Sequence, residues 1–267
     1  MKRIFSAALL LILLLCSPAA FADGEIRFTG NGIETEASGA VVEGSILTIS
    51  EPGEYTLSGT LDNGQIIVNT GEAEGKVTLI LNGVELSNLS GPVLVAEKAE
   101  KLKITVSEGT INQMTSGTAA DAESQDEDAD GAVIYSQCDL TIRGMGELSV
   151  KGYINNGITC KKDLDIKQTT LNVWAAHNGI KGTRSVHIKN STVTIRSGND
   201  GIKSTCTTRE GKGWIRIENS ALTIEADGDG ISAATDLTLT GGMATIRAGK
   251  DLYNYGATGT VSVEILS

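Results

Sequence analysis

Hydrophobic and polar residues alternate along most of this chain, in short stretches that return at a nearly constant distance. Residues 164–167 and 171–174 form one pair of such stretches. Further pairs are 140–143 with 148–151, 186–189 with 193–196, 215–218 with 222–225, and 237–240 with 244–247. Alternation with period two is typical of β-strands with one buried face, and no stretch of this region has a helical period. Each unit is therefore expected to hold two short strands with their aliphatic side chains inward.

A corner motif, Asn or Asp followed by Gly-Ile, comes after each pair of strands. It occurs as Asn156-Gly157-Ile158, Asn178-Gly179-Ile180, Asp200-Gly201-Ile202 and Asp229-Gly230-Ile231, with a degenerate copy at Asp251-Leu252-Tyr253. The steps are 22, 22, 29 and 22 residues, and the long step carries an insertion around 207–212. A period near 22 predicts an all-β solenoid, a parallel β-helix with three faces, in which each circuit of the chain is one rung. The glycines are expected to bend the chain through positive φ, and the Asn and Asp side chains to stack in a column.

The chain divides into a leader, a cap and the repeat. Met1-Lys2-Arg3, an apolar run and Ala20-Phe21-Ala22 predict a signal peptide over 1–22, cleaved near Ala22, and hence a secreted protein, extracellular or periplasmic, without membrane insertion. Residues 23–76 are expected to form an N-terminal β cap or opening rungs, and 77–267 the parallel β-helix. Residues 121–130, with six acids in ten, predict a solvated loop inserted between rungs.

Charge and composition narrow the function classes. The chain has 22 Lys and Arg against 33 Asp and Glu, and loss of the two basic residues of the leader leaves a net charge of about −13. Such an acidic chain does not bind nucleic acid by bulk charge, and it suits solubility or cation binding. Three cysteines follow the leader, Cys138, Cys160 and Cys206, so they cannot all be paired with one another, although two on neighbouring rungs could be bridged. We expect a monomer.

Several segments, in their order and spacing, resemble one family. They are 54–61 (EYTLSGTL), 79–84 (LILNGV), 108–112 (EGTIN), 134–136 (IYS), 140–148 (LTIRGMGEL) and 200–204 (DGIKS). Together they resemble the bacterial secreted carbohydrate-binding domain family, over about residues 40–255. The resemblance implies a right-handed parallel β-helix related to pectate lyases. It also implies calcium-dependent or calcium-stabilised binding of cellulose or of acidic sugars such as polygalacturonate.

The corner column is the first candidate for calcium. Ca²⁺ takes six to eight oxygen ligands from carboxylates, amides and backbone carbonyls. Asp200 and Asp229 are charged and occupy consecutive corners, while Asn178 and Asp251 extend the column and Asp227 adds a nearby carboxylate. The acidic segment 121–130 is a second candidate. The alternative is that these side chains only shape and stack the corners.

A row of outward residues is the candidate sugar site. Lys151, Trp174, Arg196, Glu225 and Arg247 share one rung position, and Lys181 and Lys203 share another, each after a corner Ile. Guanidinium and ammonium groups pair with uronate carboxylates, and an exposed Trp174 can stack on a pyranose ring. The alternative is that these cations are ordinary solvating residues that also discourage aggregation.

These patterns, together with what the resemblance implies, predict a secreted, non-catalytic protein that binds polysaccharide with calcium. One alternative is a calcium-dependent polysaccharide lyase, in which Arg196 or Lys203 near Asp200 acts as the base. A second is a structural envelope or adhesin solenoid without a sugar ligand. His177 and His187 form no zinc signature, and no nucleophile motif is present.

Overall fold

The computed structural model describes residues 22–73, 75–118, 132–254 and 261–264. The predicted signal peptide lies outside these residues except for Ala22, and the predicted acidic loop 121–130 lies outside them entirely. Every regular element of the described part is a β-strand. None of its segments is a helix long and apolar enough to span a membrane.

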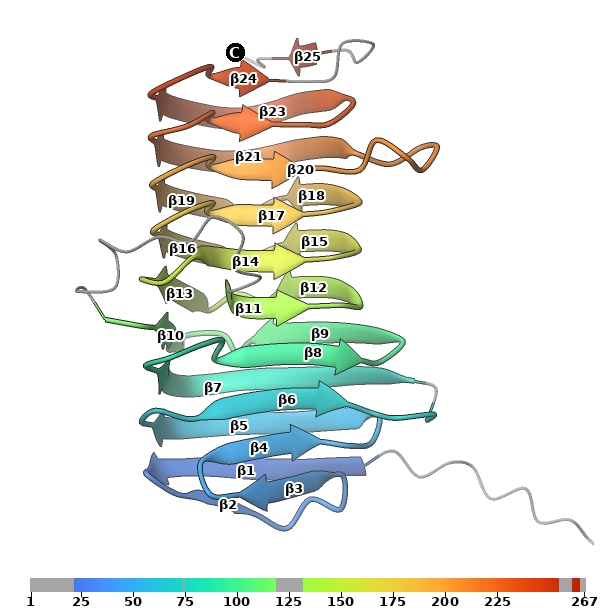
Figure 1. Cartoon of the computed structure of the whole chain (residues 1–267), viewed down its shortest axis with the longest axis vertical. Helices are drawn as coiled ribbons and strands as arrows, with labels where there is room; N and C mark the ends of the chain where they lie inside the picture. Colours follow the sequence, from blue (N-terminus) through green and yellow to red (C-terminus); the bar gives the residue numbers. More distant parts are fainter. Residues whose placement is uncertain (1–21, 74, 119–131, 255–260, 265–267) are drawn as a thin grey trace, which may run out of the picture.

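The strands form two sheets that run the length of a tall stack (Figure 1). The ten-stranded sheet contains β3 (Ala40–Glu43), β4 (Ile46–Ile49), β6 (Gln65–Asn69), β8 (Leu94–Lys98), β11 (Ala132–Ser136), β14 (Asn156–Cys160), β17 (Ile180–Gly182), β20 (Ile202–Ser204), β22 (Ile231–Ser232) and β24 (Tyr253–Asn254). Most rungs contribute one strand to it, which makes it the first face of the stack.

The fifteen-stranded sheet wraps around the other two faces. Its first row holds β1 (Ala22–Gly30), β2 (Ile33–Thr35), β5 (Gly53–Leu61), β7 (Lys76–Asn88), β9 (Lys101–Val106), β12 (Asp139–Arg143), β15 (Asp163–Lys167), β18 (Ser185–Lys189) and β25 (Val261–Glu264). Its second row holds β10 (Ile111–Ser116), β13 (Glu147–Gly152), β16 (Thr170–Ala175) and β19 (Thr192–Ser197). The long strands β7, β21 (Trp214–Ala226) and β23 (Leu237–Ala248) continue through both rows.

Strand pairing follows the sequence period. Leu164 pairs with Val186, Val186 with Ile215, and Ile215 with Leu237, so equivalent residues of successive rungs lie side by side. All these pairs are parallel, and only β1 with β2 and β3 with β4, at the N-terminal end, are antiparallel among the described strands. The predicted all-β class with parallel strands is confirmed. The predicted boundary at residue 76 stays a prediction, and β5 pairs in parallel with β1 on one side and β7 on the other.

Stacked aliphatic side chains fill the interior. Leu164, Val186, Ile215 and Leu237 are at most 1% exposed, and the alternating residues of the same strands face outward. Full burial of each such side chain stabilises the fold by about 1.5–3 kcal/mol. Cys138 and Cys160 belong to this interior, and burial raises the pKa of the Cys160 thiol to about 12. Both are free thiols, as is the partly buried Cys206.

The corner glycines are required for a different reason from the predicted one. Gly157, Gly179, Gly201 and Gly230 are absent from the positive-φ residues, so the expectation of a left-handed bend there is wrong. A Cβ on Gly179 would lie 2.4 Å from Ile195 Cγ2 and 2.6 Å from the carbonyl oxygen of Gly201. The glycines therefore let adjacent corners and the core approach closely. Three non-glycine residues with positive φ instead lie at the corner between the two rows, Gln168, Asn190 and Asn219 (φ 54°, 50° and 48°), and a fourth, Asn63 (φ 50°), lies between β5 and β6.

Candidate functional site

The predicted outward row lies on the second row of the large sheet. Lys151 pairs with Trp174, Trp174 with Arg196, Arg196 with Glu225, and Glu225 with Arg247. Each residue occupies the equivalent outward position of its strand. Five consecutive rungs thus present lysine, tryptophan, arginine, glutamate and arginine in one line.

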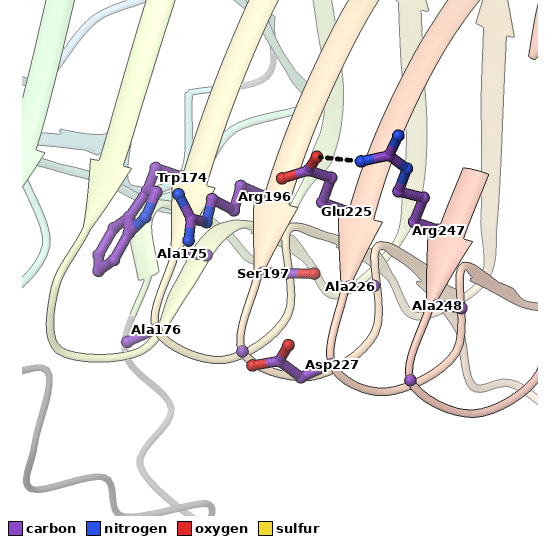
Figure 2. A pocket seen from close by; sticks show the side chains of 12 residues that line it. Trp174, Ala175, Ala176, Arg196, Ser197, Glu225, Ala226, Asp227, Arg247 and Ala248 are labelled. Atoms are coloured by element: carbon purple, nitrogen blue, oxygen red, sulfur yellow. Dashed lines mark ion pairs between the residues drawn. The ribbon is translucent and has the colours of Figure 1, made fainter. Parts of the chain in front are cut away.

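Four of these rungs enclose a groove of about 450 Å³. It is lined by Trp174, Ala175, Ala176, Arg196, Ser197, Gly198, Glu225, Ala226, Asp227, Arg247, Ala248 and Gly249. The long side chains stand along one side, and the residues at the bends that follow are small except for Asp227 (Figure 2). The groove therefore runs along the stack, across successive strands. Lys151 continues the row beyond the lining residues.

The charges of the groove are only partly paired. Arg247 Nη1 lies 3.7 Å from Glu225 Oε1, and the two side chains are 81% and 52% exposed, so this ion pair contributes little to stability. Arg196 and Lys151 have no ion pair or hydrogen bond through their side chains to any residue that the structure describes. Arg196 is exposed, between Trp174 and Glu225. It is thus a cation available to an anionic ligand.

Trp174 belongs to an aromatic pair that the sequence analysis missed. The rings of Trp174 and Tyr153 lie 4.7 Å apart between centroids, at 48° to each other. Such a contact contributes about 0.5–1.5 kcal/mol beyond the area it buries, and it restricts the orientation of the indole. Tyr153 comes two residues after Lys151, and this spacing is the signal that could have placed it near the row.

A second outward row, also missed, lies beside the first. It consists of Ser149, Asn172, Thr194, Thr223 and Thr245, paired across successive strands. These residues are uncharged and offer hydroxyl and amide groups, which can donate and accept hydrogen bonds. Asn172 already donates to Glu147 Oε1 at 2.8 Å. The charged row is therefore flanked by a polar, neutral surface.

Lys181 and Lys203 lie on the other sheet. They pair with each other between β17 and β20, so they do not join the groove of Trp174 and Arg196. Lys203 Nζ donates to Asp200 Oδ2 at 2.6 Å, and the carboxylate of that pair is only 6% exposed. The Lys203 side chain therefore turns back to a buried carboxylate of its own corner and does not point toward the groove.

The predicted column of corner side chains exists, and it is a hydrogen-bond ladder. Asn156 Oδ1 accepts from the backbone N–H of Asn178 at 2.9 Å, and Asn178 Oδ1 from that of Asp200 at 3.3 Å. Asp200 Oδ1 accepts from the N–H of Asp229 at 2.8 Å, and Asp229 Oδ1 from that of Asp251 at 3.3 Å. Each side chain therefore satisfies a backbone donor of the next rung, buried in all but the last case, and ties the two corners together.

The ladder does not fit calcium. The second oxygen of Asp200 is taken by Lys203, and that of Asp229 accepts from Asn254 Nδ2 at 2.9 Å. Asp227 is exposed at the groove rather than in the column, and Asp251 stands exposed at its end. In the described part of the chain, no three or more His, Cys, Asp or Glu side chains are placed to hold a metal ion. The predicted set of Asn178, Asp200, Asp227, Asp229 and Asp251 thus does not converge on one ion.

The inserted segment of the long rung is anchored two rungs away. Lys212 Nζ donates to both carboxylate oxygens of Asp163, at 2.9 and 2.7 Å, and Ser185 Oγ donates to Oδ1 at 2.6 Å. Burial of the Asp163 carboxyl raises its pKa, but these hydrogen bonds outweigh that effect and hold the pKa below its ordinary value. The loop between β20 and β21 projects from the stack (Figure 1) and returns through this contact.

Comparisons with known proteins agree with this architecture. The family model described as "Carbohydrate-binding domain-containing protein" matches residues 43–264. A protein of Acetivibrio thermocellus with the same description is 38% identical over 127 residues, which are 48% of this chain and 44% of that protein. The match therefore spans less than half of that relative. A solved structure of the polysaccharide lyase-like protein from C. thermocellum, a gadolinium derivative, has a TM-score of 0.81 at 30% identity, covering 91% of this chain and 97% of that one.

Proposed function

The chain belongs to the family of carbohydrate-binding domain-containing proteins, and from that premise we propose that it is an exported, non-catalytic protein that binds polysaccharide in the groove of Trp174, Arg196, Glu225 and Arg247. The observation that carries the proposal is the groove itself. It combines an aromatic ring, which contacts Tyr153, with the guanidinium of Arg196, which has no partner among the residues that the structure describes, and with a flanking neutral polar row. Sugar recognition uses these groups together: ring stacking, charge-assisted pairing and hydroxyl hydrogen bonds.

The ligand class follows from these side chains. Trp174 suits the apolar face of a pyranose, as in cellulose, while Arg196 and Arg247 suit the carboxylate of an acidic sugar such as polygalacturonate. The groove crosses parallel strands that are about 4.8 Å apart, a spacing close to the length of one sugar unit in an extended chain. A polysaccharide lying along the stack therefore meets a new side chain at each rung.

The finer architecture is part of this proposal. We assign the coil to the right-handed parallel β-helix, with about 22 residues in most rungs and an N-terminal β cap. The parallel register of Leu164, Val186, Ile215 and Leu237 supports it, as does the likeness to the lyase-like structure. Export is supported by the charged start, apolar run and Ala20-Phe21-Ala22 of the first 22 residues.

Calcium dependence remains a proposal without an assigned site. Its support is the acidic composition of the chain and the gadolinium derivative of the similar structure, since calcium and gadolinium are both hard cations that prefer oxygen ligands. The corner ladder is not put forward as the site, because its oxygens accept hydrogen bonds from the neighbouring rungs.

Retention on polysaccharide gels tests the proposed function. The purified protein is expected to be retarded in native gels that contain soluble cellulose derivatives or polygalacturonate, and the double variant Trp174→Ala, Arg196→Ala to migrate as in a plain gel. Arg143→Ala is the matched control, because this exposed arginine lies on the first row of the large sheet. Equal migration of the wild type with and without every glycan tested would contradict sugar binding.

A polysaccharide lyase is the second candidate, favoured by the likeness to a protein described as polysaccharide lyase-like. Lyase cleavage of a polyuronate creates an unsaturated product that absorbs in the ultraviolet. We expect no rise in that absorbance when the protein is incubated with polygalacturonate, with or without added calcium. A rise in absorbance that a chelator abolishes would show that the protein is a calcium-dependent lyase and would contradict the non-catalytic proposal.

A further inference from the structure

The outward row places its positive charges at alternate rungs. Lys151, Arg196 and Arg247 occupy every second position, while Trp174 and Glu225 occupy the positions between them. Neighbouring parallel strands are about 4.8 Å apart, so the cations repeat at about 10 Å along the groove. The repeat is fixed by strand pairing, and the insertion in the long rung does not disturb it because Arg196 still pairs directly with Glu225.

The two intermediate positions are unsuited to a carboxylate. Trp174 presents an aromatic ring, which favours the apolar face of an uncharged sugar. Glu225 presents a carboxylate of its own, which repels a second one placed beside it. Arg247 lies 3.7 Å from Glu225, but both side chains are mostly exposed, so the arginine can turn to a ligand at little cost.

Resting on the proposed function, we infer that the groove selects an anionic polysaccharide that presents a carboxylate to the protein on every second sugar, with its chain parallel to the axis of the stack. Carboxylates about 10 Å apart then meet Lys151, Arg196 and Arg247 in turn. Sugars between them stack on Trp174 or lie beside Glu225. The adjacent row of Asn172, Thr194, Thr223 and Thr245 offers hydrogen bonds to hydroxyl groups of either kind of sugar.

Two kinds of polymer present this pattern. One is a uronan with a disaccharide repeat of one acidic and one neutral sugar. The other is a homouronan in a two-fold extended conformation, in which every second carboxylate turns away to solvent. Both polymers present carboxylates to the protein at a two-sugar spacing. Their contacts with Glu225 distinguish one polymer from the other. Glu225 faces a neutral sugar in the first polymer, and in the second it tolerates the ligand only while the intermediate carboxylate stays turned away.

Calorimetric titration with oligosaccharides of equal length tests the inference. The ligands are an alternating acidic–neutral chain, a homouronan and a neutral chain, and the proteins are the wild type, Arg196→Ala and Glu225→Gln. Arg143→Ala and Glu108→Gln are controls, because both residues are exposed and lie outside the groove. The alternating chain is expected to bind at least about tenfold more tightly than the neutral chain, and Arg196→Ala to remove most of that difference, because a hydrogen bond to a charged group is worth about tenfold in affinity or more.

The outcomes distinguish the two kinds of polymer, and they distinguish failure of the two-sugar spacing from failure of the proposed function. If the homouronan binds more weakly than the alternating chain, and its affinity rises in Glu225→Gln, the result supports the disaccharide repeat. If the homouronan binds as tightly as the alternating chain, and Glu225→Gln leaves its affinity unchanged, the result supports the two-fold chain. A homouronan that binds more tightly than the alternating chain, or a neutral chain that matches the acidic ones, overturns the two-sugar spacing while sugar binding stands. Binding of no oligosaccharide overturns both the spacing and the proposed function.

Discussion

The ammonium nitrogen of Lys212 lies 2.7 Å from Oδ2 of Asp163, although 49 residues separate them in the chain. The contact holds the inserted loop of the long rung against the start of β15, two rungs below. Ser185, on the rung between, donates to the same carboxylate. Side-chain contacts thus join three rungs on the outside of the stack, in addition to the backbone hydrogen bonds between their strands.

Replacing Lys212 by Met is expected to destabilise the protein by about 1 kcal/mol, because a carboxylate with two charge-assisted hydrogen bonds loses them. Urea unfolding followed by circular dichroism measures the loss. Lys76→Met is the control, since the Lys76 ammonium lies 3.8 Å from Glu100 and both side chains are mostly exposed. Equal effects of the two substitutions would show that the Lys212 contact adds nothing to stability.

The same pair makes a prediction about pH. The folded pKa of Asp163 lies below its unfolded value, so its contribution is complete above the unfolded pKa of about 3.9 and is lost as the pH falls through the folded pKa. The stability difference between wild type and Lys212→Met should therefore be constant near neutral pH and shrink below about pH 4. A difference that grows as the pH falls would contradict this direction of shift.

The corner glycines give a sharper test of packing. A Cβ on Gly179 would lie 2.4 Å from Ile195 Cγ2 and 2.6 Å from the carbonyl oxygen of Gly201, so Gly179→Ala must displace backbone as well as side chain. Overpacking of this kind costs about 1–3 kcal/mol or more. Gly91→Ala should be nearly neutral, because nothing lies within 4 Å of its Cβ position and its φ is not positive. Thermal melts of the two variants measure the contrast.

These residues show which features the sequence could and could not predict. The register of Trp174, Arg196, Glu225 and Arg247 was predictable, because alternation and a fixed period determine which residues stack. The reason for Gly179 was not, because a motif reports that glycine is needed without telling backbone conformation from lack of space.

Contacts that do not follow the repeat could also not be predicted from the sequence. Tyr153 lies just past the end of β13, and the Lys212 contact spans an insertion that has no counterpart in the other rungs. Only the folded geometry brings such residues together. The same holds for the corner column: its stacking was predictable from the spacing, while the use of its oxygens by backbone donors was not.

Calcium provides a separate test of the corner ladder. If calcium raises the melting temperature of the protein, the double variant Asp200→Asn, Asp229→Asn is expected to keep that rise, because the ladder oxygens are used by backbone donors and by Lys203 and Asn254. The variant should nevertheless melt earlier without calcium, since the buried pair of Lys203 with Asp200 loses its charge. A calcium response that disappears in the variant would assign the ion to the ladder after all.

The groove can be observed directly through its tryptophan. The chain has two tryptophans, Trp174 in the groove and Trp214 at the start of β21, where the Arg216 guanidinium lies 5.2 Å from the ring centroid. A bound sugar that stacks on Trp174 excludes water from the indole and should change its fluorescence. That change is expected to persist in Trp214→Phe and to vanish in Trp174→Phe. Tyr153→Ala should weaken binding of neutral and acidic oligosaccharides alike, by about two- to tenfold, because the lost ring contact is worth about 0.5–1.5 kcal/mol and orients the indole. A fluorescence change that is lost in Trp214→Phe and kept in Trp174→Phe would instead place the sugar site on the first row of the large sheet.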